Sequence, residues 1–154
     1  MSHVESVNVV ITDLKALEAA CARMGAVFAK DKSTYNWFGV SVGDYPVPAG
    51  FKAADLGKCA HAIQVPGIKY EIGVVPARNP DGTLAKGLTL LYDFYGSTGR
   101  HDGQKLKRHF GDGLTKLVDA YSVEALKAKA RAQGYLSREV TRADGKIELR
   151  VSVP

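Results

Sequence analysis

The chain has little of the features that would assign it to a protein class at once. Only two of its 154 residues are cysteines, Cys21 and Cys59, and their contexts are unrelated, so no disulfide framework is predicted. No apolar run approaches the roughly 18 residues that a membrane span requires, and the first residues lack the basic and apolar regions of a signal peptide. The length of 154 residues predicts a single domain over residues 1–154, and the absences predict a cytoplasmic location.

Catalytic signatures are missing as well. There is no GxSxG motif, no acid pair at a useful spacing and no Gly-rich dinucleotide fingerprint, and Gly96–Gly99 lacks the Gly-Lys-Ser/Thr of a phosphate-binding loop. The four histidines show no HxxxH or CxxC spacing, so we expect no metal site and no cofactor. Asp93 lies in an apolar run, where it is either buried or points out from an alternating strand, and one carboxylate without a partner defines no reaction. The sequence favours a non-catalytic protein.

What the chain does have is an ordinary globular composition and an uneven charge. It is 45% hydrophobic and 24% charged, which is typical of a folded domain. The formal net charge is +5, and all of it falls from Arg100 onward, because residues 1–99 hold equal numbers of basic and acidic side chains. A cationic last third favours an anionic partner.

Hydrophobic periodicity predicts two helices. Asp13 is a good N-cap for a helix with Leu14, Leu17, Cys21 and Met24 on one face, and Gly25 is suited to end it. On this face Cys21 is expected to be a small buried hydrophobe rather than a reactive thiol. A longer apolar stripe runs from Leu114 to Ala132.

Alternation and turn residues predict the strands. Pro66-Gly67, Asn79–Gly82 and Ala143–Gly145 are turn signatures between them. In the last hairpin Ile147, Leu149, Val151 and Val153 are expected to face the core. The predicted strands are residues 7–11, 26–30, 35–42, 60–65, 70–74 and 88–95, and the C-terminal hairpin.

This element order predicts an α+β fold. We expect a mainly antiparallel sheet with two helices on one face, ferredoxin-like in style, with a β-α-β start and a long helix before a C-terminal β-hairpin. An irregular Gly/Pro-rich region is expected at about residues 43–58.

Several segments resemble, in order, the uncharacterised hypothetical chloroplast reading frame thirty-five family, which also occurs in cyanobacteria, other bacteria and phages. The resemblance rests on the opening Met1–His3 with Thr12–Leu17, on Tyr70–Gly73, on Leu90–Phe94, on Leu114–Tyr135 and on Asp144–Leu149. It departs from the family at Gly43–Phe51 and at Arg100–His109. The resemblance implies the fold and no activity, and a phage-encoded member would act in the host cytoplasm.

The strongest candidate site is a basic stretch that leads into the long helix. Within ten residues it holds four fixed positive charges and two histidines, and a helical turn there would present a cationic edge to phosphates. The alternative is a solvated connector. The candidate anion-binding residues are Arg100, His101, Lys105, Lys107, Arg108 and His109.

An aromatic group forms a second candidate. Tyr35, Trp37 and Phe38 are expected either to stack on bases or, as is more usual beside Gly39, to belong to the core or to a subunit interface.

The leading hypothesis is a binding or regulatory protein that engages nucleic acid or a nucleotide through the basic last third. The first alternative is a protein adaptor that forms a homodimer or binds another protein through strand edges or the aromatic segment. The second, which the resemblance to phage proteins implies, is a small-nucleotide sponge acting against host signalling. A membrane partner is not expected.

Overall fold

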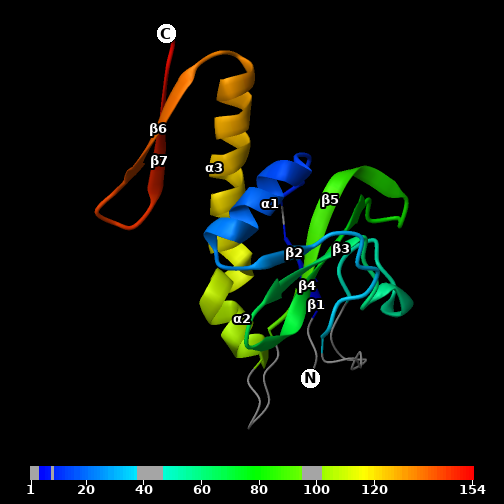
Figure 1. Ribbon diagram of the computed structural model, residues 1–154. Coiled ribbons are helices and arrows are strands. Elements are labelled where there is room, and N and C mark those ends of the chain that lie inside the picture. Colours follow the sequence, from blue (N-terminus) through cyan, green and yellow to red (C-terminus); the bar gives the residue numbers. More distant parts are fainter. Residues whose placement is uncertain (1–3, 8, 38–46, 95–101) are drawn as a thin grey trace.

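The computed structural model describes residues 4–7, 9–37, 47–94 and 102–154. In this part of the chain, a five-stranded antiparallel sheet carries three α-helices, and a separate two-stranded hairpin follows (Figure 1). The helices are α1 (Leu14–Arg23), α2 (Asp102–Phe110) and α3 (Thr115–Ala132), with short 3-10 turns η1 (Ala53–Asp55) and η2 (Asp112–Leu114). The strands are β1 (Val4–Ser6), β2 (Val27–Ala29), β3 (His61–Val65), β4 (Ile68–Arg78), β5 (Leu84–Asp93), β6 (Leu136–Thr141) and β7 (Ile147–Ser152).

The main sheet has the order β1-β5-β4-β3-β2, with every neighbouring pair antiparallel. Two predicted turns join its central strands. Gly67, at the β3–β4 turn, has φ +84°, a conformation that an L side chain disfavours. At the β4–β5 turn the Gly82 N–H donates to the Asn79 carbonyl over 2.9 Å. The central hairpin and its turn are confirmed.

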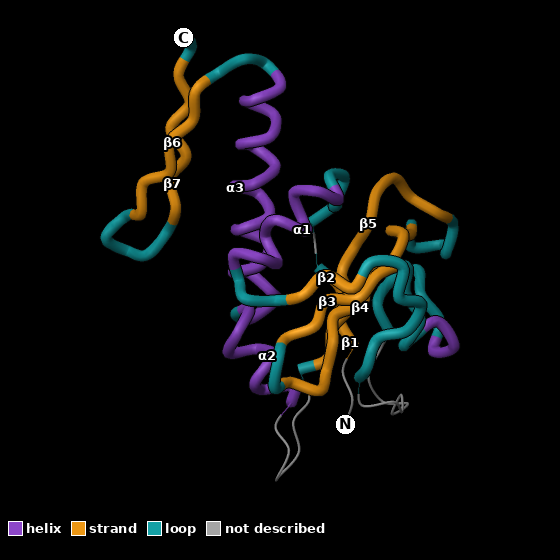
Figure 2. The backbone as a smooth tube through the Cα atoms, in the orientation of Figure 1, coloured by secondary structure: helices purple, strands orange, loops and turns teal. Residues whose placement is uncertain are grey.

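The two faces of the sheet carry different layers. Strand side chains alternate, so Ile72, Val74 and Leu90 pack with the helices, while Val75 and Leu91 pack on the opposite face. Figure 2 shows the helices on one side of the sheet and the loops with η1 on the other. The predicted class, α+β with helices on one face of an antiparallel sheet, is confirmed.

The first helix follows the sequence signals closely. Asp13 is the N-cap, and its carboxylate accepts the Ala16 N–H over 3.0 Å. Leu17 and Cys21 are fully buried on the predicted face. The Tyr121 hydroxyl of α3 accepts the N–H groups of Thr12 and Asp13, at 3.0 and 3.1 Å. The start of α1 is thus tied to the middle of α3.

Two strand predictions differ from the structure. The first strand is β1, at residues 4–6, instead of 7–11; Ile11 makes only an isolated bridge to Leu88, because the register against β5 shifts between these contacts.

Residues 35–37 form no strand, and the rest of the predicted 35–42 segment lies outside the described residues. The Tyr35 N–H instead donates to the Gly57 carbonyl over 3.0 Å, so this segment crosses the sheet as a loop. In the described part of the Gly/Pro-rich region, loop surrounds η1.

The C-terminal hairpin forms as predicted, but its apolar side chains do not enter the core. Leu149 is only partly buried, and Ile147, Val151 and Val153 are exposed. The expectation that they face the core was wrong. The reason is tertiary: β6 and β7 form their own two-stranded sheet beside α3 instead of joining the main one (Figure 1).

Candidate functional site

The predicted basic stretch contains a complete helix, α2. Leu106 and Phe110, four residues apart, lie on one face and are fully buried in the core between the sheet and α3. Gly111 follows with φ +84° and ends the helix, since an L side chain there would be strained. The core therefore determines which face of α2 points to solvent.

Three hydrogen bonds hold α2 against the rest of the protein. The buried Asp102 accepts the Lys69 N–H through Oδ1 over 3.0 Å, which joins the first turn to β4. Gln104 donates from Nε2 to the Phe94 carbonyl over 2.9 Å. At the other end, His109 Nε2 lies 2.5 Å from the Met24 carbonyl at the end of α1, and because a carbonyl oxygen only accepts, the nitrogen donates. The helix is anchored at both ends.

The outward face of α2 is cationic. At 100° per residue, Arg108 lies opposite the buried arc, with Lys105 and Lys107 on either side of it. Lys105 and Arg108 are exposed, and Lys107 is half-buried. Among the described residues, no ion pair neutralises any of these three side chains. Their positive field is therefore directed to solvent.

Several other cations of the chain form ion pairs. Arg23 contacts Glu124 over 3.1 Å and also pairs with Glu139, and Arg78 lies 3.0 Å from Asp55. In the last third, Arg142 and Arg150 each contact an acid of their own hairpin. The charge asymmetry of the sequence is thus concentrated on α2 more than on the hairpin.

Three predicted anion-binding residues remain to be placed. Arg100 and His101 fall outside the described residues. His109 is half-buried, packs edge-on against Phe110 and is bonded to Met24, so it anchors the helix and leaves the anion-binding role to its neighbours.

The predicted aromatic platform is not a surface. Tyr35 is 2% exposed in the core on the loop face of the sheet, so it cannot stack on a base, and its core alternative is confirmed. Trp37 is half-buried against the same cluster, and Phe38 lies outside the described residues. Burial raises the pKa of Tyr35 to about 12.

Tyr35 allows a stability test. Its hydroxyl is buried and has no hydrogen-bond partner in the described part of the chain. Tyr35→Phe keeps the ring and removes the unsatisfied group, so we expect it to raise the free energy of unfolding by about 1 kcal/mol. Urea denaturation measures this, and a variant less stable than the parent would show that the hydroxyl is satisfied.

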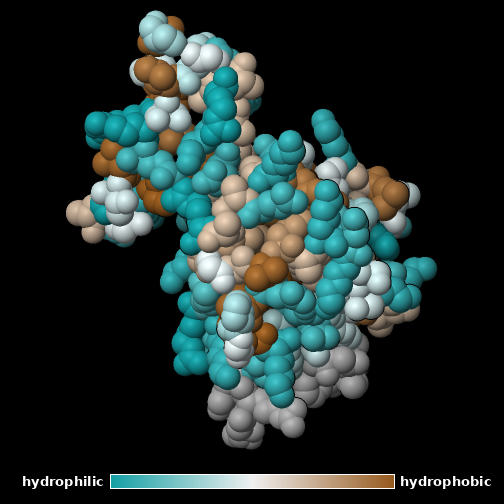
Figure 3. All heavy atoms as spheres, in the orientation of Figure 1, coloured by the Kyte–Doolittle hydropathy of each residue, from teal (hydrophilic) through white to brown (hydrophobic). Residues whose placement is uncertain are grey.

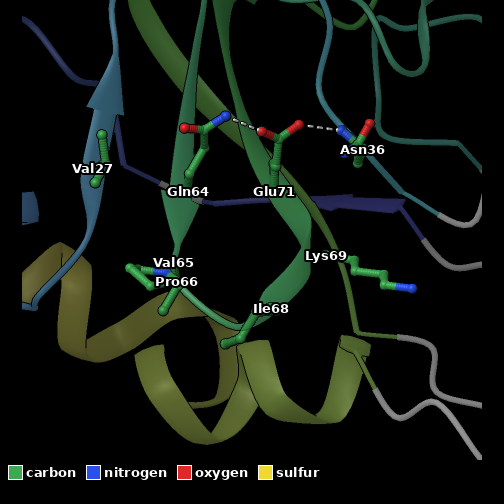
Figure 4. Close-up of a pocket in the computed structure, with 8 residues that line it drawn as sticks. All are labelled: Val27, Asn36, Gln64, Val65, Pro66, Ile68, Lys69 and Glu71. Carbon is green, nitrogen blue, oxygen red and sulfur yellow. Dashed lines mark hydrogen bonds between the residues drawn. The ribbon is translucent and has the colours of Figure 1, made fainter.

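Sequence reasoning missed a buried polar cluster on the loop face of the sheet. Glu71 in β4 is 4% exposed, yet its carboxylate accepts the Asn36 N–H over 2.7 Å and bonds Gln64 Nε2 over 2.5 Å (Figure 4). Lys32 Nζ lies 2.8 and 3.0 Å from the two carboxylate oxygens. Glu71 precedes the helix-facing Ile72, so alternation along β4 places it on the other face of the sheet, but no local sequence signal indicates that a loop covers that face.

The cluster sits in one wall of a shallow pocket of about 420 Å³. The pocket continues over Val27, Val65, Pro66 and Ile68. Burial raises the pKa of Glu71, but the bonds from Lys32, Gln64 and Asn36 outweigh it and hold the pKa below its ordinary value. The carboxylate is thus ionised and saturated with donors at neutral pH, which makes it a structural support rather than a proton-transfer group.

The two cysteines are not reactive nucleophiles. Burial, with a smaller contribution from Glu18, raises the pKa of Cys21 to about 12. Burial also raises the pKa of Cys59 to about 11, and its thiol donates to the Lys32 carbonyl over 3.1 Å. Both are therefore protonated at neutral pH, as expected for packing residues.

Comparisons with models of protein families, with curated proteins and with solved structures give no match. None of the helices in the described ranges is both long enough and apolar enough to span a bilayer. Over the same ranges, no three His, Cys, Asp or Glu side chains are grouped so as to hold a metal ion.

Proposed function

We propose that this chain is a non-catalytic binding protein for phosphate-bearing partners, nucleic acid or free nucleotide, and that the outward face of α2 is its contact surface. The observation that supports this most is the set of three cations, Lys105, Lys107 and Arg108, on a helix anchored at both ends with no acid of the described chain to pair them. Because the helix is held in place, its backbone is already ordered before binding, and only the side chains lose conformational freedom.

The residue types suit phosphate. Arg108 carries a planar fork of donors that matches two phosphate oxygens, while the lysines act as point charges on either side of it. Side chains three residues apart on a helix, such as those of Lys105 and Arg108, are separated by about 5–6 Å at Cβ. Both can therefore approach one phosphate or two successive phosphates of a strand.

A further exposed cation belongs to the strand whose backbone contacts α2. Lys69 of β4 is exposed, and its backbone is bonded to Asp102 in the first turn of α2. Lys69 also lines the pocket that contains Glu71 (Figure 4). Because Ile68, Tyr70 and Ile72 pack with the helices, alternation directs the Lys69 side chain to the other face of the sheet, so Lys69 is not counted with the α2 cations.

A triple variant tests the proposal. With Lys105, Lys107 and Arg108 all replaced by alanine, we expect the affinity for a labelled single-stranded oligonucleotide to fall about 30-fold at low salt. The slope of log K against log salt concentration should fall by about 2, since each phosphate contact releases counterions. Fluorescence anisotropy over a salt series measures both, and competition with a nucleoside triphosphate distinguishes a nucleotide site from a strand site.

The matched control removes the same charge elsewhere. Lys15, Lys58 and Lys86 are exposed and lie outside α2, so replacing them by alanine changes the net charge equally. Cations in the last turn of a helix also stabilise it by about 0.3–1 kcal/mol each, so circular dichroism must show that the triple variant stays folded. Equal losses in both triple variants, or no loss in the α2 variant, would overturn the proposed surface.

Membership of the hypothetical chloroplast reading frame thirty-five family and a cytoplasmic location are likewise proposals. The first is supported by the sequence segments that resemble that family. The second is supported by the shortage of cysteine and of apolar runs in the sequence.

A further inference from the structure

The hairpin of β6 and β7 leaves an apolar surface uncovered. None of its residues is buried, and Leu136 is 63%, Val151 49% and Ile147 36% exposed. Figure 3 shows hydrophobic side chains on the surface of this arm, which stands away from the main body. An isolated two-stranded hairpin is marginally stable in water, so an exposed one of this kind needs further contacts.

The arm is nevertheless held in a defined position. Glu139 of β6 pairs with Arg23 of α1 and lies 3.7 Å from Lys127 of α3. Behind this ion cluster a hollow of about 930 Å³ separates the hairpin from the helices, lined in part by Leu126, Ile147 and Leu149. The helices thus place the hairpin without covering it.

The backbone of β7 also has an unpaired edge. The Arg142 N–H donates to the Lys146 carbonyl over 2.8 Å, so this is a hydrogen-bonded pair of the ladder. Hydrogen-bonded and non-hydrogen-bonded pairs alternate in an antiparallel ladder, and the register continues as Thr141–Ile147, Val140–Glu148 and Glu139–Leu149. Ile147, Leu149 and Val151 therefore direct their N–H and C=O groups away from β6. No other strand of the described chain pairs with them.

We propose that this edge binds a second copy of the chain, with β7 antiparallel to β7 about a two-fold axis at Leu149. The sequence from residue 147 to 151 is Ile-Glu-Leu-Arg-Val, which is self-complementary when reversed. Leu149 then faces its own copy, Ile147 faces Val151, and Glu148 faces Arg150 twice over. The two hairpins become one four-stranded antiparallel sheet.

Charge selects this register over its neighbours. Only residues whose N–H and C=O groups point away from β6 can form hydrogen bonds with the second copy. The alternative registers therefore place the two-fold axis at a neighbouring residue, Glu148 or Arg150. An axis at Glu148 places the two Glu148 side chains together and sets Arg150 against Lys146, and an axis at Arg150 places the two arginines together. Like charges directly opposite are destabilising. The axis at Leu149 pairs opposite charges at both positions.

The proposed register also brings an acid to two arginines that face each other within the hairpin. Arg138 and Arg150 lie directly opposite one another on the face turned away from the helices. Glu148 of the same chain contacts Arg150 over 3.3 Å, on one side only. In the dimer, Glu148 of the second copy lies across from Arg150. Each pair of Arg138 and Arg150 therefore has an additional acidic neighbour.

Charge exchange tests the pairing. Sedimentation equilibrium should give twice the chain mass of 16.5 kDa for the parent protein. Glu148→Arg and Arg150→Glu each create two like-charge contacts per dimer, so each should raise the dimer Kd about tenfold or more. The double variant Glu148→Arg/Arg150→Glu restores both contacts and should return the Kd to the parent value.

The control is Arg131→Glu, which makes the same charge change as Arg150→Glu at an exposed position of α3 and should leave the Kd unchanged. A parent protein that is monomeric at ~100 µM would overturn the proposal. So would a dimer that both single variants leave intact, or one that the double variant fails to restore. The α2 triple variant should remain dimeric, which separates this result from the anion-binding test.

Cross-linking tests the position of the axis. In a Cys59→Ser background, Leu149→Cys should form an intermolecular disulfide under mild oxidation, because hydrogen-bonded partners have Cα atoms about 5.5 Å apart. Ile147→Cys should not, since its copies would be about 13 Å apart along the strands. Cross-linking at residue 147 and not at 149 would show that the axis lies elsewhere.

Discussion

Replacing Glu71 by alanine is expected to lower the free energy of unfolding by about 3 kcal/mol at neutral pH, the typical cost of breaking a buried ion pair. The substitution leaves Gln64 Nε2 and the Asn36 N–H without their acceptor on the covered face of the sheet. Lys32 loses its partner too, but its side chain is 34% exposed and regains water. Urea denaturation at pH 7 measures the loss.

The effect should depend on pH in one direction. The pKa of Glu71 is lower in the folded protein than its ordinary value of 4.5, so its charge stabilises the fold above that value. This contribution is lost as the pH falls through the folded-state pKa. The isosteric variant Glu71→Gln should therefore be about 2 kcal/mol less stable than the parent at pH 7, and the difference should shrink below about pH 4.5.

Glu71→Gln is also the control for packing, because it keeps the volume of the side chain. The glutamine amide has one acceptor oxygen, whereas the carboxylate has two. Its NH₂ group is a donor, and it would face the donor groups of Lys32, Asn36 or Gln64 without forming a hydrogen bond. A glutamine variant as stable as the parent at pH 7, or a difference that grows in acid, would contradict the assignment of Glu71 as an ionised support.

The second large effect is expected at Gly73. A Cβ there would lie 2.4 Å from Cδ1 and 2.5 Å from Cε1 of Tyr35, well inside contact distance. The ring cannot move into solvent because Tyr35 is 2% exposed. Gly73→Ala should therefore lower the free energy of unfolding by about 3 kcal/mol through overpacking.

A double-mutant cycle isolates that contact. In a Tyr35→Val background the ring is gone, so Gly73→Ala should lower stability by less than about 1 kcal/mol. The matched measurement is chemical denaturation of all four proteins under one condition. Equal losses in both backgrounds would mean that the strand, and not the ring, disfavours a side chain at residue 73.

The predictions from sequence that held are those with a local cause. Asp13 caps α1 because its carboxylate reaches the N–H three residues on, and Gly67 and Gly82 close turns whose conformation few other residues adopt. The three cations of α2 could be located from their density along the chain. That they share an outward face followed only once Leu106 and Phe110 were known to be buried.

What the sequence left open or placed wrongly depended on distant contacts. His109 bonds a carbonyl 85 residues away, and Tyr35 is covered by residues from β1, β3, β4 and β5. The alternation of residues in the last hairpin correctly predicted which side chains share a face. It could not predict whether other parts of the protein would pack against the apolar face.

By itself the sequence determined the α+β class, the capped first helix, the long last helix, the hairpin turns and the presence of a basic segment, because caps, turns and periodicity act over a few residues. Only the tertiary structure decided that Glu71 is a saturated buried carboxylate, that Tyr35 belongs to the core and that β7 keeps a free edge. Burial and backbone pairing are set by segments tens of residues apart, whose approach depends on how all the layers pack together.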